Sequence, residues 1–271
     1  MSYVQFLAFL LVPPLVLVGL VAAVRLPGPA DRRAVRRTLG ALGVYLVLAV
    51  VWTAPWDGYL IVHGVWTHGD VIGRFLRVPA EEYAFMVGQT ILTGLWTVVV
   101  LTARSTSVPG AGVAVRFNRR LGSATAWAVA ALACWLVHPL WTEGFYLTAI
   151  VGWFGPLFAL QAAVGADRLA VAGPRLRLLA VGVPTAYLWV ADRIAIGAGT
   201  WSLDPELTLP VRPLGLPVEE AVFFLVTNLV LVNGLILASD PTMWHRFTAL
   251  RAALPGRHRT QSPPAKQQGS R

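Results

Sequence analysis

Charged residues are scarce in this sequence. Only 13% of its 271 residues are Asp, Glu, Lys or Arg, whereas 56% are hydrophobic. Soluble domains carry about 25% charged residues, so this composition excludes an ordinary water-soluble fold and favours a chain that folds in a lipid bilayer. The bilayer is therefore the first expected partner.

Cysteine and lysine are almost absent, since Cys134 and Lys266 are single examples. One cysteine can form no intrachain disulfide. The lone lysine lies in the C-terminal tail, which excludes a retinal photoreceptor, because that class needs a lysine in its last helix. His63, His68 and His138 lack the paired spacing of a metal site, and no G-x-G-x-x-G motif is present. We therefore predict no metal and no cofactor.

Long apolar runs dominate what is present. A helix of about 20 apolar residues crosses the hydrocarbon core of a bilayer, and backbone groups in lipid must be paired within the segment, which favours helices. The sequence predicts an all-α integral membrane fold with seven spanning helices, at residues 3–24, 39–55, 79–101, 123–140, 145–164, 176–191 and 217–238.

Arginine gathers in alternate loops. The first, third and fifth loops are rich in it, as in Arg32, Arg36, Arg119, Arg120 and Arg175, whereas the loops between them are poor in it. Basic loops stay on the cytoplasmic side, so we predict that the N-terminus is outside and the C-terminus inside, in a multi-pass protein of the cell membrane. The net charge of +9 thus serves orientation, and no nucleic-acid partner is expected.

Two motifs occur twice. Asp57, Gly64 and Trp66 form the pattern D-x6-G-x-W, which returns at Asp192 with an offset of 135 residues. The pattern P-x-E-E-x-x-F begins at Pro79 and again at Pro217, with an offset of 138. Such a repeat indicates duplication of a structural unit.

The repeat predicts a parallel arrangement of three, one and three helices. A single helix between two three-helix units makes both units start on the same side of the membrane. Inverted repeats, which many transporters have, would not do so. The predicted divisions are a first repeat (1–104), a linker helix (105–144), a second repeat (145–240) and a basic, disordered tail (241–271).

Six carboxylates are predicted to converge on one membrane face: Asp57, Glu81, Glu82, Asp192, Glu219 and Glu220. Carboxylates are costly near lipid, so they usually indicate function. The dipole at a helix start favours the charged form and burial favours the neutral acid. This balance suits proton transfer, although a glutamate in a first turn can also be merely a cap or dipole partner.

In these blocks the sequence resembles the lycopene cyclase family of small membrane proteins, which occur as two short subunits or as fused chains. The resemblance runs from Thr53 to Gln89 in the first half and from Asp192 to Asn228 in the second. It includes the P-x-E-E signature twice, with Met86 as a departure where the second copy has Phe224.

The resemblance implies an enzyme of the intramolecular lyase or isomerase class that closes the ends of a lipophilic carotenoid, with lycopene β-cyclase as the main expectation. Ring closure adds one proton and removes another. We expect Glu81 and Glu219 to be the principal acid and base candidates, tuned by the other four acids, with the roles undivided. The expected substrate-binding residues, near the acids and in the polar stripes below them, are Trp66, Phe85, Gln89, Trp201, Phe223, Phe224, Thr227 and Asn228.

Other functions stay open at this stage. A cyclase of fifty-carbon carotenoids that forms β, γ or ε rings would carry the same motifs. A transporter or a structural membrane subunit could also hold carboxylates in a helix bundle. The sequence indicates nothing about contacts with other carotenoid enzymes.

Overall fold

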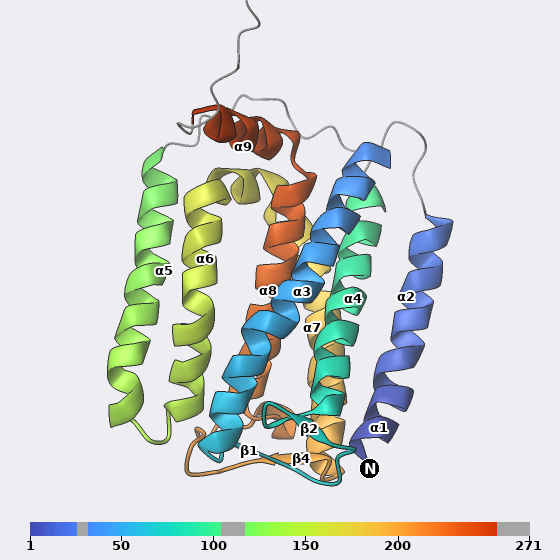
Figure 1. Ribbon diagram of the computed structural model, residues 1–271, viewed down its shortest axis with the longest axis vertical. Coiled ribbons are helices and arrows are strands. Elements are labelled where there is room, and N and C mark those ends of the chain that lie inside the picture. Colours follow the sequence, from blue (N-terminus) through green and yellow to red (C-terminus); the bar gives the residue numbers. More distant parts are fainter. Residues whose placement is uncertain (26–31, 104–116, 254–271) are drawn as a thin grey trace, which may run out of the picture.

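The protein is a bundle of long helices with short strands at one end (Figure 1). The computed structural model describes residues 1–25, 32–103 and 117–253. Seven helical segments in this part are long and apolar enough to cross a membrane, which confirms the predicted all-α class with seven spans. They are Tyr3–Val24 (α1, Tyr3–Phe6; a π-helical turn, Leu7–Leu11; α2, Val12–Val24), α3 (Arg32–Val62), α4 (Ala80–Ala103), α5 (Phe117–Val137, extended by a 3₁₀ turn, His138–Leu140), α6 (Phe145–Ala172), α7 (Pro174–Gly197) and α8 (Val218–Ser239).

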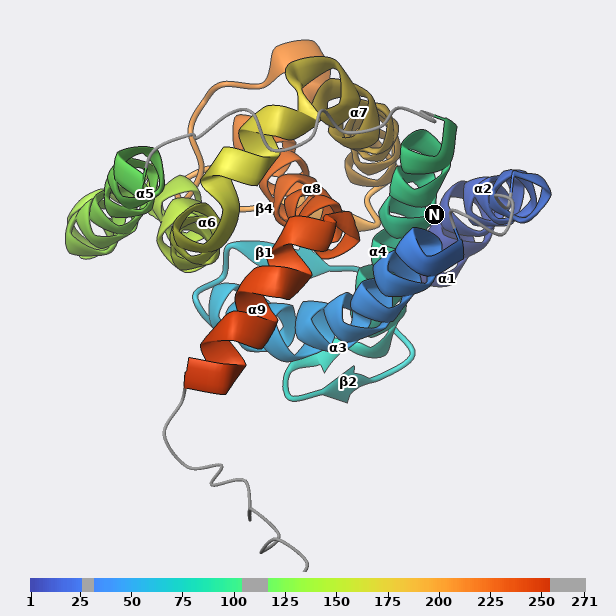
Figure 2. The same ribbon diagram turned by 90° about the horizontal axis from the view of Figure 1, so that it is seen from above.

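Two of these helices form the centre of the bundle. In α4 and in α8, 61% of the apolar stretch is buried, against 6% in the first span and 11% in α5. Seen from above, α2 and α5 lie at opposite outer edges (Figure 2), and α5 packs against α6. Most residues of these two helices are therefore shielded, and a site on their buried faces can exclude lipid and water.

The helices α3 and α7 run further than their apolar patterns predict. The predicted spans ended at residues 55 and 191, just before Asp57 and Asp192, yet each aspartate lies five residues before the helix end, at Val62 and Gly197 respectively. Both aspartates are buried. A hydropathy pattern stops at a carboxylate, whereas the bundle interior accommodates one, so the helix continues past it.

A glycine ends each of these two helices. Gly64 and Gly199 have φ of +79° and +69°, a left-handed conformation that residues with a Cβ disfavour. The amide of Gly64 donates to the Ile61 carbonyl and that of the next residue to Leu60, while Gly199 and its successor make the same pair of bonds. This is the Schellman ending of a helix. It explains why each repeat has a glycine two residues before its tryptophan.

Short strands follow these turns. Strand β1 (Trp66–His68) pairs antiparallel with β4 (Trp201–Leu203), in the register Trp66 to Leu203 and His68 to Trp201. Strands β2 (Arg74–Phe75) and β3 (Val78–Pro79) form a hairpin, and a 3₁₀ turn (Pro213–Gly215) precedes α8. The sequence pattern had indicated no strands. Pro79 and Pro217 also precede α4 and α8 by one residue, rather than opening them as predicted.

The opposite end of the bundle is covered by α9 (Pro241–Ala253), across its top in Figure 1. The tail from 241 onward was predicted to be disordered, but its first part, α9, is a helix. Asp240 caps this helix by accepting from the Thr242 amide, at 2.8 Å. Asp167 holds it through Arg246, at 2.5 Å, and also binds Arg120, at 2.6 Å. These polar contacts leave no hydropathy signal. Residues 254–271 lie outside the described residues.

Candidate active site

Four of the six predicted carboxylates line one cavity at the strand end of the bundle. Asp57, Glu82, Asp192 and Glu220 come from α3, α4, α7 and α8 respectively. The cavity has a volume of about 30 Å³, enough for one or two water-sized groups. Its other lining residues are Tyr3, Thr53, Trp66, His68, Phe85, Met86, Gln89, Trp201, Phe223 and Phe224.

The other two carboxylates turn away from this cavity. Glu81 accepts a hydrogen bond from the backbone amide of Ile72, and Glu219 accepts one from that of Leu209, both at 2.7 Å. Neighbouring helical residues point about 100° apart, so the two glutamates of each pair cannot face the same side. The first fixes the loop before its helix and the second faces the cavity. Glu81 and Glu219, expected as the principal acid and base, are buried but do not line the cavity.

Glu220 is held by two donors. Its Oε1 atom accepts from the indole nitrogen of Trp66, at 3.1 Å, and from the hydroxyl of Tyr146, at 2.9 Å. Trp66 comes from β1 in the first half of the chain and Tyr146 from the start of α6. Hydrogen bonds to a carboxylate stabilise its charged form, and charged acceptors make the stronger bonds.

Glu82 has a different partner. Its Oε1 atom lies 3.2 Å from Nε2 of His68. The His68 ring stacks on Tyr3, with centroids 6.2 Å apart, and Tyr3 also lies beside Glu82. The other ring nitrogen, Nδ1, is buried without a hydrogen-bond partner among the described residues. Glu82 thus contacts an imidazole, whose nitrogens can both donate and accept hydrogen bonds.

Each of the two aspartates is close enough to both cavity glutamates for their charges to interact. Asp57 and Asp192 each interact with both Glu82 and Glu220. Asp192 accepts from the indole of Trp201, at 2.9 Å, whereas Asp57 has no hydrogen bond within the described part of the chain, and one of its oxygens is buried. Among the described residues, no arginine or lysine lines this cavity. Four charged carboxylates would repel one another strongly there, so the group must share protons.

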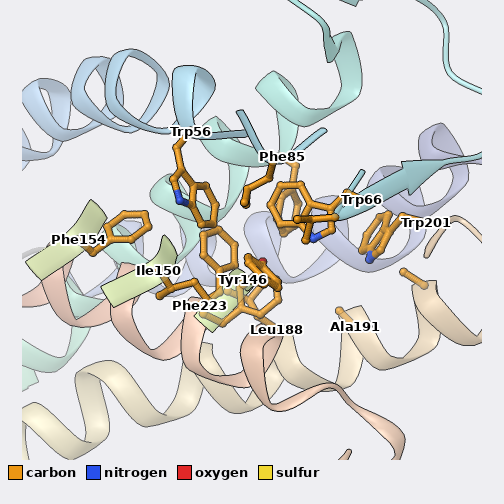
Figure 3. Packing of buried hydrophobic residues seen from close by; sticks show 14 of the residues in the cluster. Trp56, Trp66, Phe85, Tyr146, Ile150, Phe154, Leu188, Ala191, Trp201 and Phe223 are labelled. Carbon is orange, nitrogen blue, oxygen red and sulfur yellow. The ribbon is translucent and has the colours of Figure 1, made fainter. Parts of the chain in front are cut away.

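Aromatic rings enclose the acids. Trp56 stacks on Phe223, with centroids 5.1 Å apart at 18°, and meets Trp66 edge to face, at 5.5 Å. Figure 3 shows these rings gathered with Tyr146 and Phe154 in one cluster. Such faces attract cations. The sequence analysis did not assign Tyr3, Trp56, His68 or Tyr146 to the site. The one usable signal was that Tyr3 and Tyr146 begin equivalent apolar runs.

A second, larger cavity adjoins the first and is mostly apolar. It has a volume of about 170 Å³ and shares Thr53 and Gln89 with the acid cavity. Thr227 and Asn228 also line it. All eight residues predicted to bind substrate therefore line one cavity or the other, although their role in binding stays a prediction.

A buried polar ladder crosses the wall of the second cavity. Thr93 donates to Asn228, at 2.8 Å, and Asn228 donates to Thr185, at 2.9 Å. These bonds satisfy the Asn228 amide in an apolar setting, where an unpaired one would be costly. They fix α4, α7 and α8 relative to one another, further along the helices from the acids toward α9.

The described part of the chain contains no obvious set of metal ligands. There, no three His, Cys, Asp or Glu side chains are grouped so that they could hold an ion.

Comparison with known proteins gives close relatives. The chain is 43% identical to proteins named lycopene beta-cyclase from two strains of Halobacterium salinarum, over 239 residues that cover 87% of this chain and 95% of theirs. It is 32% identical to a protein named bifunctional lycopene cyclase/phytoene synthase from Aspergillus oryzae. The 201 matched residues cover 72% of this chain and 34% of that protein. No family model matches the chain, and no solved structure matches it significantly.

A 43% identity over nearly the whole length of both chains spans the two repeated motifs and all four acids of the cavity. The chain therefore belongs to the lycopene cyclase family.

Proposed function

We propose that this enzyme closes the linear ends of lycopene into β-rings by proton transfer within the acid cavity. The observation that carries this proposal is the pairing of two neighbouring cavities. One holds four carboxyl groups in an aromatic enclosure, and the other is a mostly apolar space that shares Thr53 and Gln89 with it. A hydrocarbon can occupy the apolar space while its end meets the acids.

The reaction needs one proton in and one proton out. A carboxylic acid adds a proton to C2 of the terminal double bond, which leaves a cation at C1. The next double bond attacks it, the bond from C1 to C6 forms, and the cation moves to C5. Loss of the C6 proton to a carboxylate gives the β-ring. The product is an isomer of the substrate, so no oxidant or reductant is consumed.

We assign the acid to Glu82 and the base to Glu220. Two donors stabilise a charged Glu220, which suits a group that receives a proton. Glu82 has neither of those donors, so its neutral form is less disfavoured, and it contacts the His68 imidazole instead. This proposal gives Glu81 and Glu219 a structural role, because both are occupied with loop amides.

The aspartates suit the return of the proton. Each turnover leaves an extra proton on the base and a deficit on the acid. Asp57 and Asp192 interact with both glutamates, so they can pass the proton back through the shared group. The Oδ1 atom of Asp57 has no hydrogen-bond partner in the described part of the chain, so it is available to hold the shared proton.

The aromatic enclosure protects the cation. Trp66 and Phe223 line the acid cavity and Trp56 packs behind both, and each cation–π contact contributes roughly 0.5–2 kcal/mol. They also keep out water, which would quench the cation to an alcohol. At about 30 Å³ the cavity holds only one or two water-sized groups, so little solvent lies beside the acids.

The membrane arrangement belongs to this proposal. Arg36, Arg120, Arg175 and Arg246 lie at the α9 end of the bundle or beside it, and the positive-inside rule makes that end cytoplasmic. The acids would then lie near the outer face of the cell membrane, with the N-terminus outside. The parallel repeat, with halves at 1–104 and 145–240, is supported by the equal bonds of Glu81 and Glu219 and by the matching glycine turns.

Expression of the chain in cells that accumulate lycopene tests the function. Extracted pigments should shift from lycopene to β-ring products on reversed-phase chromatography, with an absorption spectrum of changed fine structure. A fifty-carbon substrate preference would appear instead as poor use of lycopene and good use of the longer polyene. Unchanged lycopene beside membrane-inserted, folded protein would refute the proposal.

A further inference from the structure

A third hollow continues the path from the acid and apolar cavities toward the other end of the bundle. It has a volume of about 560 Å³ and shares Tyr45 with the apolar cavity. Its walls include four small residues, Gly40, Ala41, Gly234 and Ala238, with Trp244 of α9 at its edge. The three spaces therefore form one series, joined by shared residues.

A row of α3 residues spaced four apart lines the three spaces in turn, and it winds about 200° around the helix from one end to the other. Residues four apart on a helix lie above one another, and the row from Arg37 in steps of four meets the third hollow, the apolar cavity and the acid cavity in turn. The row comprises Arg37, Ala41, Tyr45, Ala49, Thr53 and Asp57. Its ends are twenty residues apart, which is about 30 Å of helix, comparable to the hydrocarbon thickness of a bilayer.

Tyr45 divides this path. Its hydroxyl lies 3.3 Å from the amide nitrogen of Gln161 on α6, and that nitrogen also donates to the Val230 carbonyl, at 2.7 Å. A Cβ atom at Gly234 would lie 1.7 Å from the Tyr45 hydroxyl oxygen. The ring thus reaches across to α8, and only a glycine at 234 leaves room for it.

We propose that Tyr45 is a specificity-determining residue, and that the third hollow is the subsite for the far end of the polyene whose near end meets the acids. The inference rests on the proposed function, because it takes a long, rigid hydrocarbon as the occupant. Tyr45 then sets how long or bulky a far end the enzyme accepts. A far end that already carries a ring is wider than a linear one, so this position governs whether the second end is closed.

The same hollow has one competing occupant. Arg36 and Arg37 border it, and guanidinium groups bind lipid phosphates. Arg37 is engaged, however, with its charged carbon 5.3 Å from the centre of the Trp244 ring. The other walls are apolar, and the hollow joins the apolar cavity at Tyr45. These features favour the hydrocarbon end over a headgroup.

Two glycines on α3 provide a matched pair of variants. A Cβ atom at Gly40 or at Gly43 meets nothing within 4 Å, so a side chain can leave the helix at both positions without a clash. Gly40 lines the third hollow, whereas Gly43 lines none of the three cavities. Gly40→Leu therefore fills the proposed subsite and Gly43→Leu controls for the added side chain on the same helix.

The test measures products in cells that accumulate lycopene and in cells that accumulate a fifty-carbon acyclic polyene. We expect Gly40→Leu to raise the ratio of monocyclic to bicyclic product about tenfold, the scale of a small steric change in an apolar pocket. Gly43→Leu should leave it unchanged. Tyr45→Ala should raise use of the longer polyene relative to lycopene by a similar factor, and Tyr45→Phe should not.

Unchanged product ratios in Gly40→Leu and Tyr45→Ala would overturn the proposal, provided that the unmodified enzyme closes lycopene. A lipid site would give that result together with weaker retention of the Gly40→Leu variant on vesicles of anionic phospholipid. If the unmodified enzyme closes no ring, the proposed function itself fails. Should Tyr45→Ala fail to fold, the two leucine variants still decide the outcome.

Discussion

Glu82 and Glu220 occupy the same place in their two motifs, yet their surroundings differ. Each follows a glutamate that is bonded to a loop amide at 2.7 Å, and each faces the same cavity. Glu220 accepts bonds from Trp66 and Tyr146. Glu82 instead contacts His68, which pairs with Trp201 across the small sheet. A duplicated skeleton thus presents two chemically distinct acids.

The difference shows how duplication can produce an acid and a base. A reaction that takes up and releases one proton needs two groups with opposite preferences. Identical copies would have equal proton affinity, and neither would be poised for its step. Changing the partners while keeping the carboxylates separates the roles without moving the groups.

The largest expected effect comes from Glu82→Gln, which removes the acid. The amide keeps its size but has no proton to give to the polyene. We expect activity to fall by about 10²–10⁴, the usual contribution of a general acid, with lycopene recovered unchanged. Pigment chromatography, normalised to enzyme in the membrane, measures this effect. Appreciable β-ring product in this variant would remove Glu82 from the role.

The variant Glu220→Gln should differ from Glu82→Gln in the products that it forms. Protonation and ring closure can still occur, but the cation lacks its base. We expect a smaller loss of total turnover and a new product pattern, with γ- or ε-rings or a hydroxylated ring, because other groups or water remove the charge. Mass spectrometry and the absorption spectrum identify these products. A variant that returns only unchanged lycopene would contradict the assignment of Glu220 as base.

The hydroxyl groups of Tyr146 and Tyr3 provide a further test of whether the two glutamates differ. Tyr146→Phe removes a donor to Glu220, and a bond to a charged group is worth about 1.5–3 kcal/mol, so we expect activity to fall about tenfold or more. Tyr3→Phe is the matched variant in the other half. Its effect should be smaller, because the Tyr3 hydroxyl lies beside Glu82 but makes no hydrogen bond of good geometry within the described residues. Equal losses in both variants would indicate that the two glutamates are equivalent.

The smallest effect on chemistry is expected at Glu81 and Glu219. Glutamine keeps the oxygen that accepts the loop amide, so Glu81→Gln and Glu219→Gln should retain activity. Glu219→Ala leaves the Leu209 amide without its partner and should lower stability by about 1–3 kcal/mol, seen as a lower melting temperature in detergent. A large activity loss in the glutamine variants, at unchanged stability, would restore the first glutamates as the acid and base.

The sequence predicted the bundle well, because lipid imposes simple constraints. Seven apolar runs became seven spanning helices. The ends were less accurate, since buried Asp57 and Asp192 look like helix ends in a hydropathy pattern. The strands β1 and β4 were missed because three residues are too few for an alternating pattern.

The site was predicted as a group of acids but not in its detail. Repetition singled out both glutamate pairs, yet adjacent residues carry no information about which of them faces inward. That choice depends on the loop amides of Ile72 and Leu209. The partners His68 and Tyr146 also come from segments whose proximity only the folded chain reveals.

The sheet formed by β1 and β4 has a consequence for how such a chain can be divided. Each half supplies a strand, and Trp66 of the first half completes the surroundings of Glu220 in the second. Neither fragment alone can furnish a finished reaction centre. Two separately translated pieces would regain function only if they assembled with each other. A mismatched pair would lack the residues that one half contributes to the glutamate of the other.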